Sequence, residues 1–182
     1  MMPDPRWVIL DRDGVINEDS DAYIKSVAEW KPLPGSLEAI ARLSRAGWRL
    51  AVVSNQSGIG RGLFTAATLD RINAHMLDAV AAAGGRIDGV YVCPHRPDQG
   101  CDCRKPEPGL LLRAAADLGF AIEGVPFIGD KQSDVDAARA AGARPMLVRS
   151  SHHAAAVSPA DNGVECFADL AAAADALLAE AE

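Results

Sequence analysis

The sequence lacks any long hydrophobic run. None of its 182 residues belongs to a stretch that approaches the roughly 18 apolar residues of a membrane-spanning helix. Residues 1–6 include two prolines and no long apolar region, so we expect no secretory signal peptide. These absences lead us to expect a cytoplasmic protein that does not bind membranes.

Basic residues are also in short supply. Lysine and arginine together number 18 against 25 aspartates and glutamates, which gives a net charge of −7 at pH 7. A general nucleic-acid-binding protein presents a basic face, so we expect no nucleic-acid partner. An anionic small molecule is still compatible with this charge, because a local basic pocket is enough to bind it.

Only four cysteines are present, and the expected cytoplasm keeps thiols reduced. Metal ligands or free thiols therefore explain them better than disulfides. Three of them join a histidine in the pattern C-x-H-x5-C-x-C, formed by Cys93, His95, Cys101 and Cys103. Three thiolates and one imidazole fit tetrahedral Zn²⁺, and four protein ligands are typical of a structural site. The sequence thus predicts a zinc loop, with Cys166 left as a free thiol.

Strand-like and helix-like segments alternate along the chain. Short apolar runs predict strands, and amphipathic segments bounded by capping residues such as Ser36 and Thr65 predict helices. The expected strands are residues 7–10, 49–53, 88–92, 125–129 and 144–148, and the expected helices are 35–46, 65–83, 107–118, 132–141 and 167–179. The alternation predicts an α/β fold: a doubly wound, mostly parallel sheet in a single domain over residues 1–182.

Two connections are longer than this fold requires. Residues 18–34 separate the first strand from its helix, and residues 93–106 follow the third strand. Long loops in a compact domain are usually functional, so we expect both to shape a binding pocket. A further loop is expected at residues 150–163, where His152 and His153 are interpreted as solvated rather than catalytic.

The first strand ends abruptly in Asp11-Arg12-Asp13-Gly14. Ligands of an open parallel sheet bind beyond the carboxyl ends of its strands, so Asp11 and Asp13 should face such a crevice. They would share one wall, as residues i and i+2 of a strand do, unless the chain curls. Two close carboxylates tend to raise one pKa, and a cation such as Mg²⁺ would relieve this repulsion. A surface turn is the alternative, since Asp and Gly both favour turns.

Polar residues suited to a phosphate follow the later strands. The second strand runs into hydroxyl and amide side chains: Ser54, Asn55, Gln56 and Ser57. These groups can donate hydrogen bonds without adding negative charge. Arg104 and Lys105 directly follow the zinc loop, which would hold two cations over the crevice. Asp130 ends the fourth strand and could complete the cation site, with Asp134 orienting it or favouring the helix N-terminus.

These residues resemble the haloacid dehalogenase (HAD) superfamily of phosphatases. The four motifs of that superfamily are matched in order by Asp11-x-Asp13, Ser54, Lys105 and Asp130. The zinc loop narrows the resemblance, over about residues 7–150, to the heptose 1,7-bisphosphate 7-phosphatases. The resemblance implies hydrolysis of the 7-phosphate of a small sugar bisphosphate, in ADP- or GDP-heptose synthesis for lipopolysaccharide. The chain leaves no room for a large cap domain, and we expect a monomer.

The resemblance implies a role for each motif residue. Asp11 would be the nucleophile that forms an aspartyl-phosphate, and Asp13 the general acid and base. Mg²⁺ would be held by Asp11, Asp130 and the main-chain carbonyl of Asp13, whereas Ser54 and Lys105 would bind phosphoryl oxygens. The zinc ligands would be structural. Substrate contacts are expected from Arg12, Asp19, Asp21, Tyr23, Asn55, Gln56, Ser57, Arg104 and Lys131.

Three other activities share parts of this pattern. Histidinol-phosphate phosphatase would apply the same chemistry to another ester. A receiver-type phosphoacceptor module is also doubly wound, with acidic residues and a lysine at strand ends. Such a module needs no zinc loop, however, and it places its accepting aspartate on a later strand. A phosphomutase would transfer the phosphate rather than release it.

Overall fold

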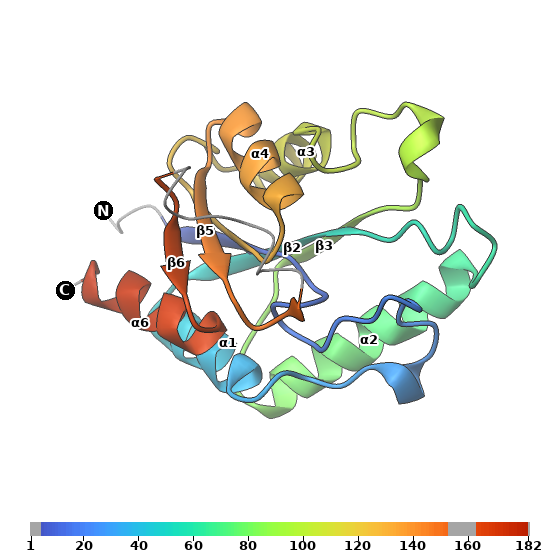
Figure 1. The fold of residues 1–182 in the computed structure, drawn as a ribbon. Coiled ribbons are helices and arrows are strands. Elements are labelled where there is room, and N and C mark those ends of the chain that lie inside the picture. The colour runs from blue at the N-terminus through green and yellow to red at the C-terminus, as the bar shows by residue number, and fades with distance from the viewer. Residues whose placement is uncertain (1–4, 153–162, 182) are drawn as a thin grey trace.

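Six parallel strands form the centre of the molecule (Figure 1). The computed structural model describes residues 5–152 and 163–181. The strands are β1 (Trp7–Leu10), β2 (Arg49–Asn55), β3 (Gly89–Cys93), β4 (Pro126–Gly129), β5 (Arg144–Val148) and β6 (Glu165–Phe167). They lie in the order β3-β2-β1-β4-β5-β6, and every neighbouring pair is parallel. All their carboxyl ends therefore meet at one edge of the sheet.

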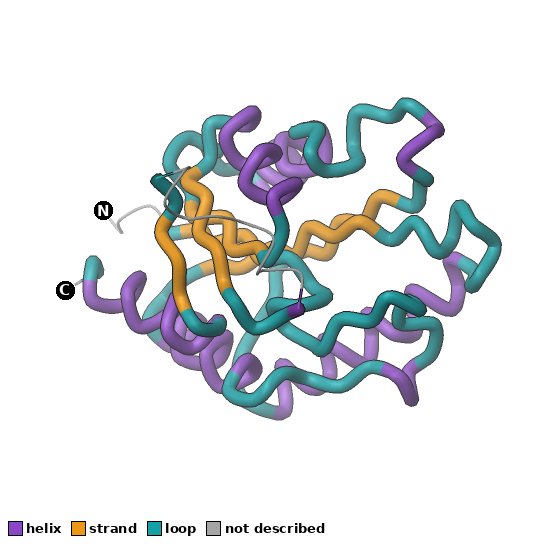
Figure 2. Tube along the Cα trace, viewed as in Figure 1, coloured by secondary structure: helices purple, strands orange, loops and turns teal. Residues whose placement is uncertain are grey.

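Helices cover both faces of this sheet (Figure 2). One face carries α1 (Ser36–Arg45), α2 (Ala66–Ala82) and α6 (Leu170–Ala179). The other carries α3 (Gly109–Leu118) and α4 (Gln132–Ala141). The two long loops each contain a short 3-10 helix, Val27–Glu29 and Pro97–Gln99. The predicted doubly wound sheet is confirmed.

The central strand β1 contributes to two separate cores. Its side chains alternate between the faces of the sheet, as in any strand. Val8 and Leu10 pack with α1, α2 and α6, whereas Ile9 packs with α3 and α4. A strand that is buried on both faces needs apolar residues at every position. This requirement explains why residues 7–10 form a continuous apolar run.

The winding of the chain changes direction beside β1. From β1 the chain proceeds through α1 to β2 and through α2 to β3. It then crosses to the other side of β1 and builds β4, β5 and β6 outward. At such a switch point the chain connections that follow two neighbouring strands run in opposite directions, and a crevice opens between them at the carboxyl ends of the strands. Asp11 after β1 and Asp130 after β4 therefore lie on one crevice.

The start of α1 differs from the prediction. Gly35, with φ of 77°, is the N-cap residue, and Ser36 is the first residue of the helix. The Ser36 hydroxyl instead donates a hydrogen bond of 2.6 Å to the carbonyl of Ile16. This contact ties α1 to the turn after β1. The second helix does begin as expected, because Thr65 accepts a hydrogen bond from the N–H of Thr68 at 3.1 Å.

The C-terminal region contains a strand that the sequence analysis missed. Residues 165–167 pair with β5, and the last helix begins later than expected because Asp169 caps it. Cys166 is a free thiol, as predicted. His153 lies outside the described residues. Within residues 5–152 and 163–181, no helix is both long and apolar enough to cross a membrane.

The first long loop, residues 18–34, is anchored at both ends. The N–H of Glu18 donates to the carbonyl of Lys31 at 2.8 Å, and the N–H of Leu33 donates to Ile16 at 2.9 Å. Trp30 is buried and meets the His75 ring of α2 edge-on, with centroids 5.4 Å apart. These contacts hold the loop beside the crevice.

Burial on α3 can be tested with two adjacent leucines. Leu111 is fully buried, whereas 44% of Leu112 is exposed. Replacing Leu111 with Ala removes buried methyl groups and leaves a cavity, so Leu111→Ala should lower the free energy of unfolding by about 2–5 kcal/mol. Leu112→Ala is the matched control and should change it by about 0.5 kcal/mol or less. Urea unfolding of the two variants compares them, and equal losses would contradict the assigned packing.

Candidate active site

A pocket of about 500 Å³ lies at the carboxyl ends of the strands. Both long loops contribute to its walls, as the sequence predicted. The residues that line it are Asp11, Asp13, Asp19, Ser20, Asp21, Tyr23, Asn55, Gln56, Ser57, Pro97, Arg104, Lys105, Pro106, Lys131, Ser133 and Asp134. The pocket therefore gathers most of the predicted site residues from segments that are far apart in the sequence.

The ammonium group of Lys105 lies among buried carboxylates. Its Nζ is 3.1 Å from Asp11 Oδ1 and 2.7 Å from Asp134 Oδ1. It also donates a hydrogen bond of 3.0 Å to the carbonyl of Val53, so all three ammonium donors have partners. Burial lowers the pKa of Lys105, but Asp11 and Asp134 outweigh burial and raise it. Lys105 is therefore cationic at neutral pH.

Three buried acids form a potential cation site. Oxygens of Asp11, Asp130 and Asp134 all lie within 4.8 Å of one another. Burial raises the pKa of Asp11, and Asp134 and Asp130 raise it further against the pull of Lys105. Asp134 also accepts hydrogen bonds from the N–H groups of Asp130 and Lys131, at 3.0 and 3.1 Å. It thus orients Asp130 and caps α4, and the oxygen-rich cluster suits Mg²⁺.

The carboxylate of Asp13 is not part of this cluster. It accepts hydrogen bonds from Arg12 Nε at 2.9 Å, Asn17 Nδ2 at 2.8 Å and Gln56 Nε2 at 2.9 Å. Burial raises the pKa of Asp13, but these donors, led by Arg12, outweigh burial and lower it. Asp13 could therefore contribute to the expected magnesium site only through its main chain.

The chain curls immediately after β1. The carbonyl of Arg12 accepts the N–H of Ile16 at 2.8 Å, and Gly14 adopts φ of 85°. A Cβ at Gly14 would collide with the carboxylate of Asp130, so this turn requires glycine. The i, i+2 relation expected between Asp11 and Asp13 does not apply, because the chain turns between them, at Arg12. The raised pKa of Asp11 accordingly comes from burial and from other acids.

Arg12 is placed differently from the expected substrate contact. Its side chain is fully buried, and Arg12 is not among the residues that line the pocket. The guanidinium binds both oxygens of Asp13, at 2.9 and 3.3 Å, and Oδ1 of Asn73 on α2 at 3.0 Å. In this geometry Arg12 orients Asp13 rather than a ligand. Asn73 gave no sequence signal, because it is one of several polar residues along the same helix.

The polar residues at the end of β2 and directly after it mostly form hydrogen bonds within the protein. Gln56 Nε2 donates to Ser54 Oγ at 2.8 Å as well as to Asp13, and Ser54 is 1% exposed. Asn55 binds the main chain of Lys105. Ser57 lines the pocket. Donor groups therefore surround the crevice as predicted, but the two amides have partners within the chain.

The first long loop is connected to the acids by Lys131. Its Nζ lies 3.0 Å from Asp19 Oδ2 and 3.0 Å from Asp130 Oδ2. Burial lowers the pKa of Lys131, but the surrounding acids, led by Asp11, raise it. Asp21 lies 3.0 Å from Nε2 of His152, so this histidine contacts a pocket residue while remaining half-exposed.

Two serines that the sequence analysis overlooked also reach the site. The Ser150 hydroxyl donates to the carbonyl of Gly14 at 2.7 Å, and the Ser151 hydroxyl donates to Asp130 Oδ2 at 2.5 Å. Both follow β5, whose carboxyl end lies at the same edge as those of β1 and β4. That position was the signal that could have identified them.

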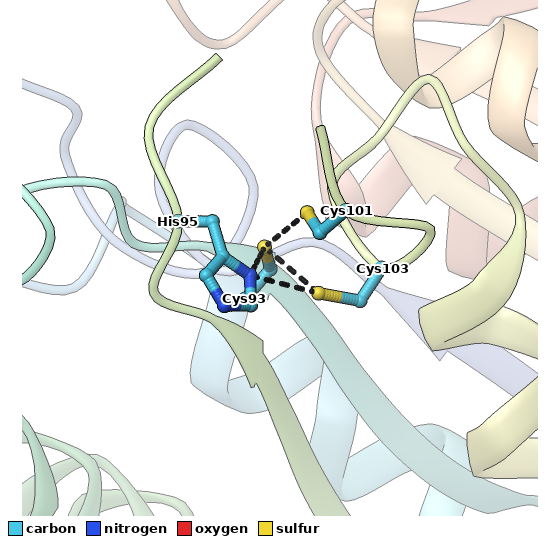
Figure 3. A group of neighbouring side chains, drawn as sticks. All are labelled: Cys93, His95, Cys101 and Cys103. Atoms are coloured by element: carbon cyan, nitrogen blue, oxygen red, sulfur yellow. Dashed lines mark hydrogen bonds between the residues drawn. The ribbon is translucent and has the colours of Figure 1, made fainter. Parts of the chain in front are cut away.

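The four predicted zinc ligands converge (Figure 3). Cys93 Sγ lies 3.4 Å from His95 Nδ1, 3.7 Å from Cys101 Sγ and 3.1 Å from Cys103 Sγ. His95 Nδ1 is 3.3 Å from Cys103 Sγ, and none of these cysteines is in a disulfide. Burial, and then the neighbouring thiols, raise the pKa of Cys103 to about 12. Three thiolates without a cation would repel one another, so the donor set fits zinc.

Comparison with known proteins identifies the family. Residues 102–173 match a family model described as HAD-hydrolase-like. The D-glycero-beta-D-manno-heptose-1,7-bisphosphate 7-phosphatase of Pseudomonas aeruginosa is 49% identical over 172 residues, covering 94% of this chain and 97% of that protein. The chain belongs to this heptose bisphosphate phosphatase family. The enzyme of the same name from Pseudomonas putida is 54% identical over 145 residues, covering 80% of this chain and 83% of the relative.

A solved structure of the heptose bisphosphate phosphatase family agrees with the fold. The D,D-heptose 1,7-bisphosphate phosphatase of Bordetella bronchiseptica matches with a TM-score of 0.91 and 46% identity. The match covers 96% of this chain and 99% of that chain. That protein was crystallised in complex with magnesium and phosphate. The HAD-like fold expected from the sequence is therefore confirmed.

The pair between Lys105 and Asp134 should be important for stability. Burial raises the pKa of Asp134, but Lys105 outweighs burial and lowers it. At pH 7, Asp134→Asn leaves the buried ammonium less compensated and should lower the free energy of unfolding by about 3–5 kcal/mol. Ionised Asp134 stabilises the fold above its unfolded pKa of about 3.8, and this contribution is lost as pH falls through the lower folded pKa.

The measurement is urea unfolding of the wild type and Asp134→Asn between pH 7 and pH 3, with a metal chelator present. The difference between the two proteins should shrink toward the acidic end. Asp136→Asn is the control, because Asp136 is an exposed acid on the same helix. A difference that stays constant over the whole pH range would contradict the ion pair.

Proposed function

We propose that this protein removes the 7-phosphate from D-glycero-β-D-manno-heptose 1,7-bisphosphate. The observation that carries the proposal is the approach of Lys105 Nζ to within 3.1 Å of Asp11 at the wall of the pocket. The relatives at 49% and 54% identity carry the name of this reaction and of this anomer. The product would serve ADP- or GDP-heptose synthesis for lipopolysaccharide.

Asp11 is the nucleophile in this proposal. Its carboxylate attacks phosphorus, and the bond to the sugar oxygen breaks to leave an aspartyl-phosphate. Lys105 holds a phosphoryl oxygen and meets the charge that grows in the transition state. Ser54 accepts a hydrogen bond from Gln56 Nε2 at 2.8 Å, which leaves the hydroxyl proton of Ser54 free to point at another phosphoryl oxygen.

Asp13 moves the protons in this proposal. In its protonated form Asp13 gives its proton to the sugar oxygen as that group leaves, and the resulting carboxylate then takes a proton from the water that hydrolyses the aspartyl-phosphate. Arg12, Asn17 and Gln56 hold its carboxylate in one orientation. A fixed orientation matters because the acid must lie within hydrogen-bond reach of the leaving oxygen.

Magnesium would be held by Asp11, Asp130 and the main-chain carbonyl of Asp13. When bound, it neutralises negative charge on the phosphate and aligns it for attack. The buried acids around Asp130 support this assignment, and so does the magnesium bound by the Bordetella bronchiseptica relative. Zinc would be held by the Cys/His cluster and would stabilise the loop that carries Arg104 and Lys105.

The rest of the pocket would bind the sugar. Arg104 and Lys131 supply positive charge, and Asp19, Asp21 and Tyr23 come from the first long loop. Residues 18–34 and 93–106 act as inserted loops of one domain, in place of a large cap. We further propose a monomer in the cytoplasm without a nucleic-acid partner, and four cysteines that form no disulfide are consistent with a reducing compartment.

Histidinol phosphate and a receiver-type module are the alternative readings. The curated relatives bear the heptose phosphatase name, which favours the sugar bisphosphate over both alternatives. A receiver also has no need for a Cys/His cluster such as Cys93, His95, Cys101 and Cys103.

The nucleophile can be tested with Asp11→Asn. An amide cannot replace the carboxylate as nucleophile, so phosphate release from the heptose bisphosphate should fall by about 10³-fold or more. Release would be measured for both anomers and for histidinol phosphate in the wild type and the variant. Asp78→Asn, an exposed substitution on α2, serves as the control. Substantial turnover by folded Asp11→Asn would exclude the assigned role of Asp11, and faster hydrolysis of histidinol phosphate would overturn the substrate.

The zinc site can be tested with Cys101→Ser. Loss of one thiolate should release zinc and loosen the loop that carries Lys105, because metal binding and folding are coupled. Metal analysis of protein purified under reducing conditions should find about one zinc per wild-type chain and much less in the variant. Cys166→Ser should retain the metal, since Cys166 lies outside the cluster. Wild-type protein without zinc would contradict the assignment.

A further inference from the structure

The side chain of Asn55 holds the main chain of Lys105 at two points. Asn55 Nδ2 donates to the carbonyl of Lys105 at 3.0 Å, and Asn55 Oδ1 accepts the N–H of Lys105 at 3.1 Å. One carboxamide therefore satisfies both polar groups of one residue. The sequence analysis expected Asn55 to contact substrate; Asn55 lines the pocket, and both of its side-chain polar atoms are bonded to Lys105.

This two-point contact joins segments that are 50 residues apart. Asn55 is the last residue of β2 and pairs with Cys93 at the end of β3. The N–H of Gln56 donates to the carbonyl of Cys93 at 2.7 Å. The end of β2 is thus bonded to the start of the zinc loop through the main chain, and to its far end through the Asn55 side chain.

The contact does not depend on the partners of the ammonium group. Lys105 Nζ already has three partners, at Asp11, Asp134 and the carbonyl of Val53. To bind a phosphoryl oxygen, an ammonium with three donors must share or give up one of these contacts. The bonds from Asn55 to the main chain can persist through that exchange. They fix the Cα from which the flexible lysine side chain extends.

We propose that Asn55 is a positioning residue, which holds the Lys105 main chain so that the ammonium meets the phosphoryl group attacked by Asp11. This inference rests on the proposed phosphatase function. Misplacement of a catalytic group by about 1 Å can cost about 10²-fold in rate. In this role Asn55 acts through Lys105.

The kinetic test is a double-mutant cycle with Asn55→Ala and Lys105→Met. In the wild-type background, Asn55→Ala should lower kcat by about 10-fold to 100-fold and change KM by about threefold or less. In the Lys105→Met background, the same substitution should cause a further loss of about twofold or less, because its target is gone. Losses that multiply in the double variant would overturn the proposal.

A structural readout does not depend on turnover. Hydrogen exchange at the amide of Lys105 should be faster in Asn55→Ala than in the wild type, and orthovanadate should bind more weakly. Ser44→Ala is the matched control, because Ser44 makes a similar two-point contact with the main chain of Arg86, at 3.0 and 3.4 Å. It should leave Lys105 exchange, vanadate affinity and kcat unchanged. Unchanged exchange at Lys105 in Asn55→Ala would overturn the proposal.

Failure of the proposed substrate and failure of the variant to fold can each be distinguished from failure of the positioning role. If the wild type does not hydrolyse the heptose bisphosphate, the proposed substrate fails, while exchange and vanadate binding still test Asn55. If Asn55→Ala does not fold, Asn55→Asp replaces it, with similar shape and an oxygen facing the Lys105 carbonyl. Asn55→Asp keeps an acceptor for the Lys105 N–H and loses only the donor to the Lys105 carbonyl, so its readout is kinetic, and its losses should be as non-additive as those of Asn55→Ala. Additive losses in Asn55→Asp would count against the positioning role.

Discussion

A buried ammonium group among buried carboxylates is the interaction on which the site depends. Lys105 contacts Asp11 and Asp134 in a region where each of these residues is at most 5% exposed. Removing either the positive charge or the negative charges would leave a buried charge without a partner, which is strongly unfavourable. The surrounding structure must therefore deliver the lysine and the acids together. The sheet positions the acids, and the loop that contains the Cys/His cluster positions the lysine.

The sheet delivers the acids through its topology. Asp11 follows β1 and Asp130 follows β4, and these strands are neighbours at the switch point. Asp134 sits on the first turn of α4 and fixes the main chain of Asp130. Lys105 arrives differently, from a loop held by the Cys/His cluster and by Asn55. The phosphatase function proposed for this chain depends on both arrangements: the sheet positions the nucleophile Asp11, and the loop positions the ammonium group of Lys105.

Most of the fold could be predicted from local patterns. The predicted bounds of β1, α4 and β5 agree with the structure residue by residue, because apolar runs and glycine stops marked their ends. The short strand β6 was missed, since three residues at a sheet edge carry too little apolar pattern. Ser36 was assigned as a cap because its type suits one, but the Ile16 carbonyl, from another part of the chain, binds its hydroxyl.

The sequence by itself determined the chemical groups of the site: the acids at strand ends, the lysine after the zinc loop and the Cys/His spacing. Their types and order follow from strand periodicity and ligand chemistry, which are local. Only the tertiary structure decided what each group contacts. It placed Arg12 on Asp13 instead of in the pocket, bonded Asn55 to Lys105 and brought Ser151 to Asp130. Such contacts depend on packing between segments that are distant in sequence, and no local pattern encodes them.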